Sequence, residues 1–451
     1  MNNHRLTGMR AFTIVWLGQV VSLLGTAMTQ FALTLWAYQL TGKATTLALV
    51  AFFTFGPTVL LSPVAGALVD RWNRKLVMML SDLGAGVATI VIFLLYTSGR
   101  LEIWQLCVAG AFTGAFQAFQ FPAYSAAITT MLPKTQYARA SGMLSLAEST
   151  SNIAAPLLAA VLIGVIGIGG IMLIDIVTFL VAIGALLLVF IPQPEMSEAG
   201  RQAQGSLWQD SIFGFKYIFR IPSLLGLQLS FFATNLIGTL AFTLTAPMIL
   251  ARTAQDQLVL GTVLSVAGVG GVLGGLLLSV WGGPKRKING VLIGFTLESL
   301  LGTLVIGLSS GLVGWSLGVF FSGFITPILN GSNQAIWQAK VQPDLQGRVF
   351  ATRRLIAQIT IPLAMLITGP LADRVFEPAM MPGGAWAEVF GGLVGAGPGS
   401  GMSLIFVISG LLGALVGLAG YAIPAIRNVE TILPDYDAIS LKPAMEGSAA
   451  A

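Results

Sequence analysis

The sequence predicts an all-α integral membrane protein with twelve transmembrane helices in two six-helix halves. Three observations support this fold class: the apolar composition, the long runs without charge, and a repeat between the two halves. Hydrophobic residues make up 55% of the 451 residues, charged residues only 9%, and the mean hydropathy is +0.85. Because a soluble domain carries about 25% charged residues, a chain this apolar could not cover a water-exposed surface, and a soluble protein is excluded.

Runs without Asp, Glu, Lys or Arg place the predicted helices along the chain. The first such runs cover 11–42, 44–69 and 103–133, and each is longer than the roughly 20 residues that cross a bilayer as a helix. We expect helices near 11–38, 46–69, 76–97, 103–129, 139–164, 168–190, 222–250, 257–281, 288–309, 312–338, 349–371 and 402–425.

A repeat divides these helices into two halves. Gly66 to Val69 at the end of the second span corresponds to Gly275 to Leu278 at the end of the eighth, a shift of about 209 positions, and a short basic turn follows each. Parallel repeats of this kind are typical of transporters, with the binding site between the halves. We expect an N-terminal half over 1–191, a cytoplasmic linker over 192–221 with an amphipathic stretch, a C-terminal half over 222–426 and a disordered cytoplasmic tail over 427–451.

The basic residues predict how the chain is oriented. With the N-terminus inside, 19 of the 23 Lys and Arg residues fall in cytoplasmic segments, as the positive-inside rule requires. Both termini are therefore expected in the cytoplasm. The net charge of +5 then reflects membrane topology, and no nucleic-acid partner is expected.

Other chemistries find little support in the sequence. A single Cys107 and a single His4 exclude a disulfide framework and a Cys/His metal site. The glycine-rich run 268–275 lies inside a predicted span and lacks the Gly-Lys pair of a phosphate-binding loop, so it predicts close helix packing. We expect no enzyme activity, no metal and no cofactor, with the proton gradient as the energy source.

The turn after the second span resembles a known family. Residues Gly66 to Lys75 (GALVDRWNRK) are similar to the signature G-x-L-a-D-r-x-G-r-k of the major facilitator superfamily, with Asn73 where the family usually has Gly. Asn also tolerates a left-handed turn. The second copy is degenerate, with Ser279 in place of the acid. The segments 137–142 and 369–374 resemble the macrolide-efflux-type drug:proton antiporter branch of that superfamily.

The resemblance implies a conformational gate at this turn. A carboxylate just beyond the end of the second span can accept hydrogen bonds from a helix N-terminus, where the helix dipole is positive, and the family pattern implies that this helix is the eleventh span. An ordinary positive-inside turn is the simpler alternative. The predicted gate residues are Gly66, Asp70, Arg71, Arg74 and Lys75.

Polar side chains at helical spacing mark a predicted substrate cavity. They lie on spans 1, 4, 5, 7 and 10, and polar faces do not point at lipid without cost. By resemblance spans 1, 4, 7 and 10 line the central cavity; hydrogen bonding between helices is the alternative. The candidates are Gln19, Ser22, Thr26, Gln30, Gln117, Gln120, Tyr124, Asn152, Asn235, Asn330 and Gln334.

Acids inside spans are the candidates for proton coupling. A carboxyl deep in a bilayer without a cationic partner is expected to exchange a proton with a cavity. Glu148 is preferred because it shares a face with Ser145 and Asn152, and Asp175 and Glu298 are further candidates. Asp82 also lies within a span but is the least favoured of the four.

Together these features predict a secondary active transporter that exports amphipathic, macrolide-like drugs in exchange for protons by alternating access. The alternatives are export of one endogenous metabolite such as a siderophore, which this branch also resembles, and a non-transporting membrane scaffold or sensor. The expected partners are a small amphipathic substrate, protons and the lipid bilayer. A monomer in the cell inner (cytoplasmic) membrane is expected, crossing it many times.

Overall fold

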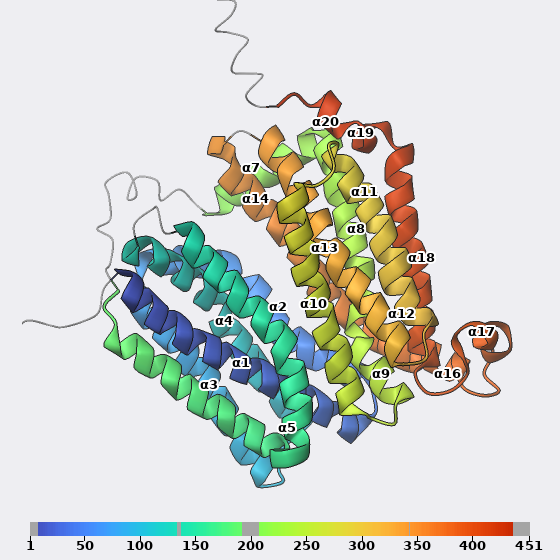
Figure 1. Cartoon of the computed structure of the whole chain (residues 1–451), viewed down its shortest axis with the longest axis horizontal. Coiled ribbons are helices and arrows are strands. Elements are labelled where there is room, and N and C mark those ends of the chain that lie inside the picture. Colours follow the sequence, from blue (N-terminus) through green and yellow to red (C-terminus); the bar gives the residue numbers. More distant parts are fainter. Residues whose placement is uncertain (1–7, 133–136, 192–206, 342, 436–451) are drawn as a thin grey trace, which may run out of the picture. The chain divides into compact units, whose positions relative to one another are not determined.

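The computed structural model describes residues 8–132, 137–191, 207–341 and 343–435, and in these ranges every regular element is a helix (Figure 1). Some side chains within the helices also lie outside the described part. Ten stretches of the described helices are long and apolar enough to cross a membrane. An all-helical membrane fold, as predicted from composition, is confirmed.

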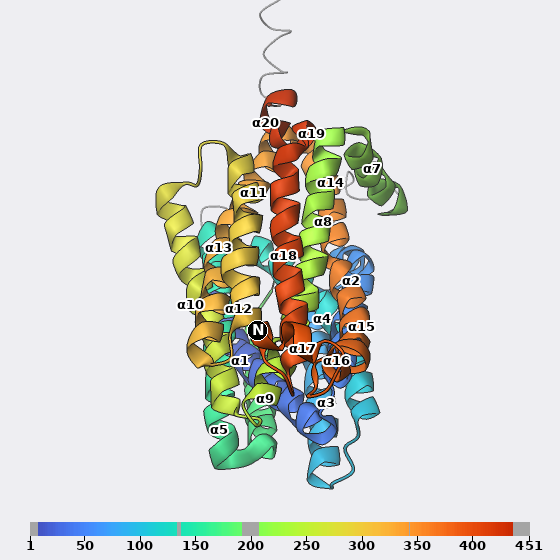
Figure 2. The ribbon, with the colours of Figure 1, turned by 90° about the vertical axis from the view of Figure 1, so that its right-hand side faces the viewer.

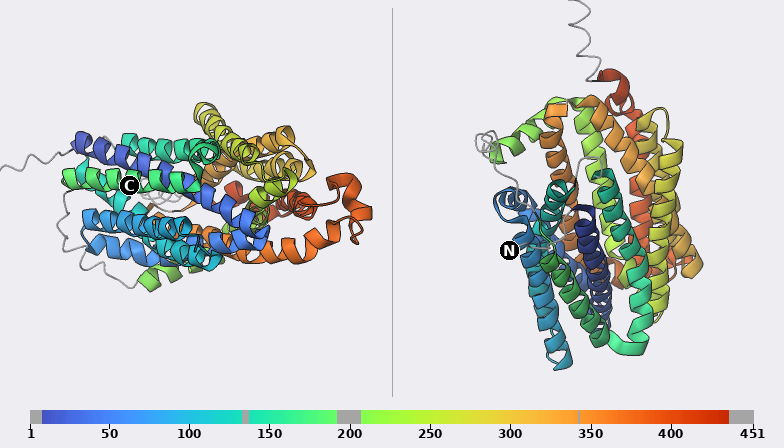
Figure 3. Two further views of the ribbon diagram at one scale, coloured as in Figure 1. Left: turned by 90° about the horizontal axis from the view of Figure 1, so that it is seen from below. Right: turned by 60° about the vertical axis from the view of Figure 1, so that its left-hand side comes forward.

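The first half consists of long helices whose bounds follow the predicted spans. They are α1 (Gly8–Thr41), α2 (Ala44–Arg71), α3 (Arg74–Thr97), α4 (Ile103–Met131) and α5 (Tyr137–Leu188). The long α5 contains the fifth and sixth predicted spans, which meet at Gly167 with φ +67° and ψ 178°. A residue with a side chain rarely adopts this φ, so glycine makes the sharp reversal there. α1 lies along the green second part of α5, as Figure 3 shows.

The second half is divided into more and shorter helices. They are α7 (Leu207–Arg220), α8 (Pro222–Thr243), α9 (Thr245–Arg252), α10 (Gln257–Trp281), α11 (Lys287–Leu297), η2 (Glu298–Thr303), α12 (Leu304–Leu308), α13 (Leu312–Lys340), α14 (Pro343–Gln358), α15 (Thr360–Leu371), η3 (Ala372–Phe376), α16 (Glu377–Met380), α17 (Ala387–Val394), α18 (Ser400–Ala422), α19 (Pro424–Arg427) and α20 (Val429–Ile432). α18 packs against α8 and α11, and Figure 2 shows it between them. The amphipathic stretch expected in the linker is the helix α7.

Glycines bring equivalent helix pairs of the two halves into backbone contact. A Cβ on Gly114 of α4 would stand 2.0 Å from the carbonyl oxygen of Thr54 on α2, and a Cβ on Gly323 of α13 would stand 2.2 Å from that of Ala267 on α10. Gly270 and Gly274 of α10 approach α13 just as closely. Small residues permit such contacts in membrane helices. The expectation that the glycine-rich run packs helices is confirmed.

The two compact units do not follow the two sequence halves. Unit 1 comprises 1–204, 244–265 and 365–375, and unit 2 comprises 205–243, 266–364 and 376–451. Within unit 1, the Ser265 hydroxyl at the start of α10 donates to the carbonyl oxygen of Ile153 on α5 at 2.6 Å. Unit 1 therefore contains helix ends from the second half as well as the first half.

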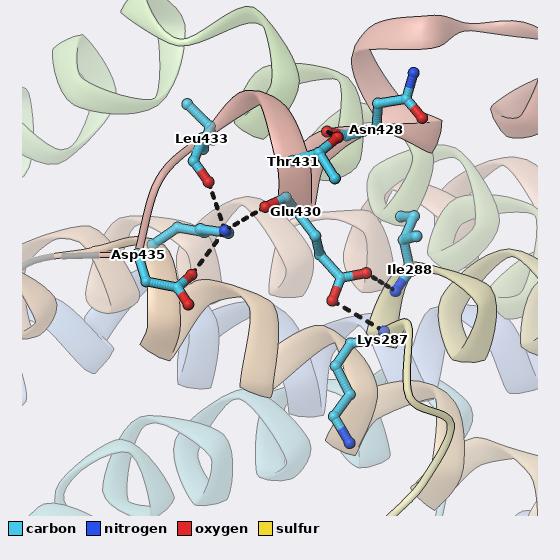
Figure 4. A network of polar contacts seen from close by, with 8 residues as sticks. Lys287, Ile288, Asn428, Glu430, Thr431, Leu433 and Asp435 are labelled. Atoms are coloured by element: carbon cyan, nitrogen blue, oxygen red, sulfur yellow. Dashed lines mark hydrogen bonds and ion pairs between the residues drawn. The ribbon is translucent and has the colours of Figure 1, made fainter. Parts of the chain in front are cut away.

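The expectation of a disordered tail from residue 427 needs correction for its first residues. Val429 is buried in the core of unit 2 together with Ile426, and α19 and α20 are formed. Glu430 caps α11, because its two carboxylate oxygens accept from the backbone N–H groups of Lys287 at 3.1 Å and Ile288 at 2.9 Å (Figure 4). Two buried apolar side chains and this cap hold the segment in place; residues 436–451 lie outside the described part.

A buried lysine fixes the same segment from the other side. Lys340 at the end of α13 donates through Nζ to the carbonyl oxygens of Glu430 and Leu433 and forms an ion pair of 2.7 Å with Asp435 (Figure 4). The Lys340 side chain is 4% exposed and that of Asp435 59% exposed. Two carbonyl oxygens therefore accept two of the hydrogen bonds that the buried ammonium group can donate. The segment packs against the start of α11 and the end of α13.

Replacing Glu430 with Ala is expected to lower the free energy of unfolding by about 1–2 kcal/mol, because α11 loses an anionic cap at its N-terminus. Glu430→Gln keeps one acceptor and should lie in between. The thermal unfolding midpoint of the protein purified in detergent measures the effect. Glu388→Ala removes an exposed acid of α17 and serves as the control; equal midpoints for all three variants would contradict the capping role.

Candidate functional site

A cavity of about 110 Å³ lies inside unit 1 between α1, α3, α4 and the second part of α5. Two acids, one on α3 and one on α5, line it together with amide, hydroxyl, small and apolar side chains. Its lining residues are Gln19, Ser22, Leu23, Thr26, Ser81, Asp82, Ala85, Gly86, Thr89, Gln117, Gln120, Asp175 and Phe179. The cavity therefore brings together predicted cavity residues of α1 and α4 with two of the acids that lie within spans.

Asp82 of α3 is held between two glutamines. Its Oδ2 accepts from Nε2 of Gln19 at 2.7 Å, and its Oδ1 accepts from Nε2 of Gln120 at 2.8 Å. Nε2 of Gln120 also donates to Oε1 of Gln19 at 3.1 Å, while Oε1 of Gln120 has no partner among the described atoms. Among the described side chains, the partners of this carboxylate are neutral amides, so its protonation breaks no ion pair there.

Asp175 of α5 is bound by hydroxyl groups instead. Its Oδ1 accepts from Oγ1 of Thr26 on α1 at 2.9 Å, and its Oδ2 accepts from Oγ1 of Thr89 on α3 at 3.1 Å. The residue is only 2% exposed. A hydroxyl can donate or accept, so Thr26 and Thr89 can serve either charge state of the carboxyl.

The two acids lie at different depths along α3. Asp82 is on α3 itself, and Asp175 is bonded to Thr89 of the same helix, seven residues further on. At a rise of about 1.5 Å per residue, this separation is about 10 Å along the helix axis. The cavity therefore extends from Asp82 to Asp175, and polar side chains line it between the two acids.

Two further predicted residues of the first half, Gln30 and Tyr124, are not among those that line the cavity. Gln30 is exposed. Tyr124 is buried in an apolar cluster beside Phe12, with ring centroids 6.3 Å apart. The side chains of Glu148 and Asn152 lie outside the described part, so the preferred coupling residue cannot be placed against the cavity.

The candidates of the second half occupy unit 2. Asn235 of α8 is partly buried and Asn330 of α13 is exposed. Gln334 of α13 accepts through Oε1 from Nη1 of Arg353 at 2.8 Å, and the guanidinium lies 5.3 Å from the ring centre of Trp337. Gln334 is therefore occupied by a cation of α14, an arrangement that the polar spacing did not predict.

Glu298 is engaged by hydroxyl groups inside unit 2. Its Oε1 accepts from Ser322 of α13 at 2.7 Å and from Thr303 at 3.2 Å. The residue opens η2, a π-helical turn between α11 and α12. The two hydroxyl groups therefore hold the Glu298 carboxyl between η2 and α13.

Only part of the predicted gate is described. Asn73 is not left-handed: with φ −64° and ψ 110° it caps α3, accepting through Oδ1 from the backbone N–H of Leu76 at 3.1 Å. Lys75 donates through Nζ to the carbonyl oxygens of Val189 at 2.6 Å and Leu187 at 3.3 Å, so it ties α3 to the end of α5. Arg74 is partly buried. Gly66 and the side chains of Asp70 and Arg71 lie outside the described part.

Asp82 is the acid that the sequence interpretation valued least. Residue counting places it about 9 Å from the inner end of its span, but does not give the direction that its side chain faces. The signal was present: Ser81, Asp82, Ala85, Gly86 and Thr89 follow one face of α3 with small and polar residues only. Such a face indicates a helix side turned away from lipid.

Among the described residues, no group of three or more His, Cys, Asp or Glu could hold a metal ion. The polar functional groups of the cavity are carboxyl, amide and hydroxyl groups. Such a set can bind and release protons and hydrogen-bond a neutral or cationic solute.

The sequence is similar to a family profile and to bacterial transporters. The sequence profile described as "Major Facilitator Superfamily" matches residues 15–365. Macrolide efflux protein A of Streptococcus pyogenes is 26% identical over 379 residues, covering 81% of this chain and 90% of that protein. Multidrug resistance protein MdtG of Citrobacter koseri is 26% identical over 379 residues, covering 80% and 87%.

Solved structures show the same fold. A bacterial homologue of the human lysosomal transporter Spinster, in an inward-facing and unoccupied conformation, aligns with a TM-score of 0.69 at 14% identity and covers 91% of this chain and 96% of that one. A bacterial homologue of the iron transporter ferroportin aligns with a TM-score of 0.62 at 16% identity, covering 91% and 98%.

Proposed function

Because this chain belongs to the major facilitator superfamily, we propose that it exports amphipathic compounds of the macrolide class in exchange for protons. The protein is a transporter and not an enzyme. It crosses the membrane many times. The exchange with protons, the substrate class and the direction are the proposed parts.

The observation that carries the proposal is the cavity with two acids. Asp82 and Asp175 line one cavity, and the hydrogen-bond partners described for their carboxylates are the amides of Gln19 and Gln120 and the hydroxyls of Thr26 and Thr89. A carboxyl at membrane depth costs free energy, so acids at such positions are typically functional, for example as members of proton relays. Asp82 and Asp175 are therefore the proposed proton carriers, in place of Glu148, which the sequence favours.

The hydrogen bonds suggest how one proton is accepted. When Asp82 is charged, both flanking amides donate to it. When Asp82 is protonated, one carboxyl oxygen becomes a donor and needs an acceptor. Gln120 offers its Oε1, which has no partner among the described atoms, after rotation of its amide. The two glutamines can therefore pair with either charge state of Asp82. Protonation of Asp82 on α3 changes the hydrogen bond that Gln120 on α4 makes.

Alternating access connects this protonation to transport. The charged and the protonated cavity differ in the hydrogen bonds they make, so proton binding shifts the equilibrium between the two access states. A substrate that binds the opposite state better moves against its gradient as protons move down theirs. The proposal places both termini in the cytoplasm, the protein in the inner membrane and the monomer as the working unit.

The substrate class rests on the relatives, because the cavity of about 110 Å³ is small beside the roughly 300–1,000 Å³ of a site for a drug-sized ligand and is assigned here to protons. Relatives covering most of the chain are named macrolide efflux and multidrug resistance proteins. Export of a single endogenous metabolite, or a role as scaffold or sensor, remains the alternative outcome of the following test.

We expect proteoliposomes of the full chain to accumulate a radiolabelled macrolide when a proton gradient, acidic inside, is imposed. A protonophore should reduce the accumulation ratio to about 1, the value without an energy source. Liposomes without protein are the control. Accumulation that survives the protonophore would contradict proton coupling. Absence of macrolide flux in either direction would favour the metabolite or scaffold alternatives.

A further inference from the structure

Two helices of this chain end in the same six-residue pattern. α2 ends in Gly-Ala-Leu-Val-Asp-Arg at 66–71, and α15 runs into Gly-Pro-Leu-Ala-Asp-Arg at 369–374; the Gly, Leu, Asp and Arg positions are identical. In the proposed orientation, α2 ends on the inner side and α15 ends on the outer side. The pattern therefore occurs once on each side of the membrane, on helices from different halves.

The outer copy is in contact with the start of α2 inside unit 1. Asp373 accepts through Oδ1 from the backbone N–H of Ala44 at 3.1 Å and through Oδ2 from that of Thr45 at 2.7 Å. Lys43, at the N-cap position of α2, makes no side-chain capping bond. A residue 329 positions away along the chain therefore caps this helix, and the helix dipole favours the negative charge there.

The glycine of the pattern makes this approach possible. A Cβ on Gly369 would stand 2.5 Å from the Cα of Thr45 and 3.1 Å from the Cβ of Ala48. Gly369 of α15 precedes Asp373 of η3 by four residues, about one helical turn. Both residues therefore lie on the side of this continuous helical segment that contacts the first turns of α2. Any side chain at 369 would hold the carboxylate away from the N–H groups.

We propose that Asp373 is an outer lock of the transport cycle: its carboxylate caps α2 while the outer side is closed and leaves the cap when the outer side opens. The inference rests on the proposed alternating access, because the rocking of one half against the other must separate residue 373 from residues 44 and 45.

The lock acts on the conformational equilibrium and touches neither substrate nor proton. When the outer side opens, the N–H groups of Ala44 and Thr45 lose an anionic acceptor and must turn to water. Asp373 therefore stabilises the outward-closed state relative to the outward-open state. A loss of its charge is expected to raise the outward-open population about two- to fivefold.

The test measures the distance between spin labels on the outer segments of the two halves. Labels are attached to cysteines at Ser98 and Glu388, both exposed, in a Cys107→Ser background of the full chain. Asp373→Asn removes the charge, and Gly369→Ala prevents the approach sterically. Both are expected to raise the share of the longer distance.

The control is an aspartate that caps its own helix on the same side. Asp256 accepts through Oδ1 from the N–H groups of Leu258 at 2.9 Å and Val259 at 3.1 Å. Asp256→Asn should leave the distance distribution unchanged. If Asp373→Asn and Gly369→Ala also leave it unchanged, the lock is refuted. Because this readout needs neither substrate nor a proton gradient, its outcome is independent of the test of proton-coupled export.

Discussion

Replacement of Asp82 by Asn is expected to abolish proton-driven accumulation of the substrate while exchange down a gradient continues. Asn has the shape of the protonated carboxyl but cannot release a proton. Its amide can still pair with Gln19 and Gln120, because the free Oε1 of Gln120 can accept from it after rotation. The accumulation ratio should fall to about 1, the value without coupling. Flux measured in proteoliposomes with and without an imposed gradient distinguishes the two activities.

Three further variants identify the proton carrier in the same assay. Asp175→Asn removes the second acid of the cavity and should also impair proton-driven accumulation. Glu298→Gln changes a partly buried acid that accepts hydrogen bonds from hydroxyl groups of unit 2, and it should keep accumulation near the wild-type level. If Glu148→Gln alone loses accumulation, the carrier is on the first part of α5 and the assignment to the cavity is wrong.

Replacement of Gly274 by Ala is expected to destabilise the protein by about 3 kcal/mol, near the upper end of the usual cost of overpacking. The added Cβ would stand 2.0 Å from the carbonyl oxygen of Phe324 on α13, and only a shift of α10 relieves this contact. A backbone carbonyl cannot rotate away as a flexible side chain can. The thermal unfolding midpoint in detergent reports the loss.

Gly275 provides a matched control on the same helix. A Cβ there meets nothing within 4 Å, so Gly275→Ala should be neutral or stabilise α10 through better helix propensity, by up to about 1 kcal/mol. Equal destabilisation by both substitutions would mean that the α10–α13 contact is not the reason for the glycine-rich run.

Local properties of the sequence were enough to predict the membrane class and the positions of the helices. Span ends such as those near 76–97 and 257–281 follow α3 and α10 within a few residues, because hydropathy and charge act on each segment independently of its neighbours. The polar stripe of Gln19, Ser22 and Thr26 on α1 was predicted for the same reason: its members share a face by helical spacing alone.

The tertiary structure decided which polar groups meet. The depth of Asp82 or Tyr124 along a helix follows from residue counting, whereas the direction that each side chain faces depends on how the helix is rotated against its neighbours. Backbone contacts such as that of Gly114 with Thr54 set this rotation. The cap of α2 by Asp373 also depends on packing, because the two residues are 329 positions apart in the chain. The pattern at 369–374 is visible in the sequence. Its partner is not, because helix packing, and not sequence proximity, brings the carboxylate to the N-terminus of α2.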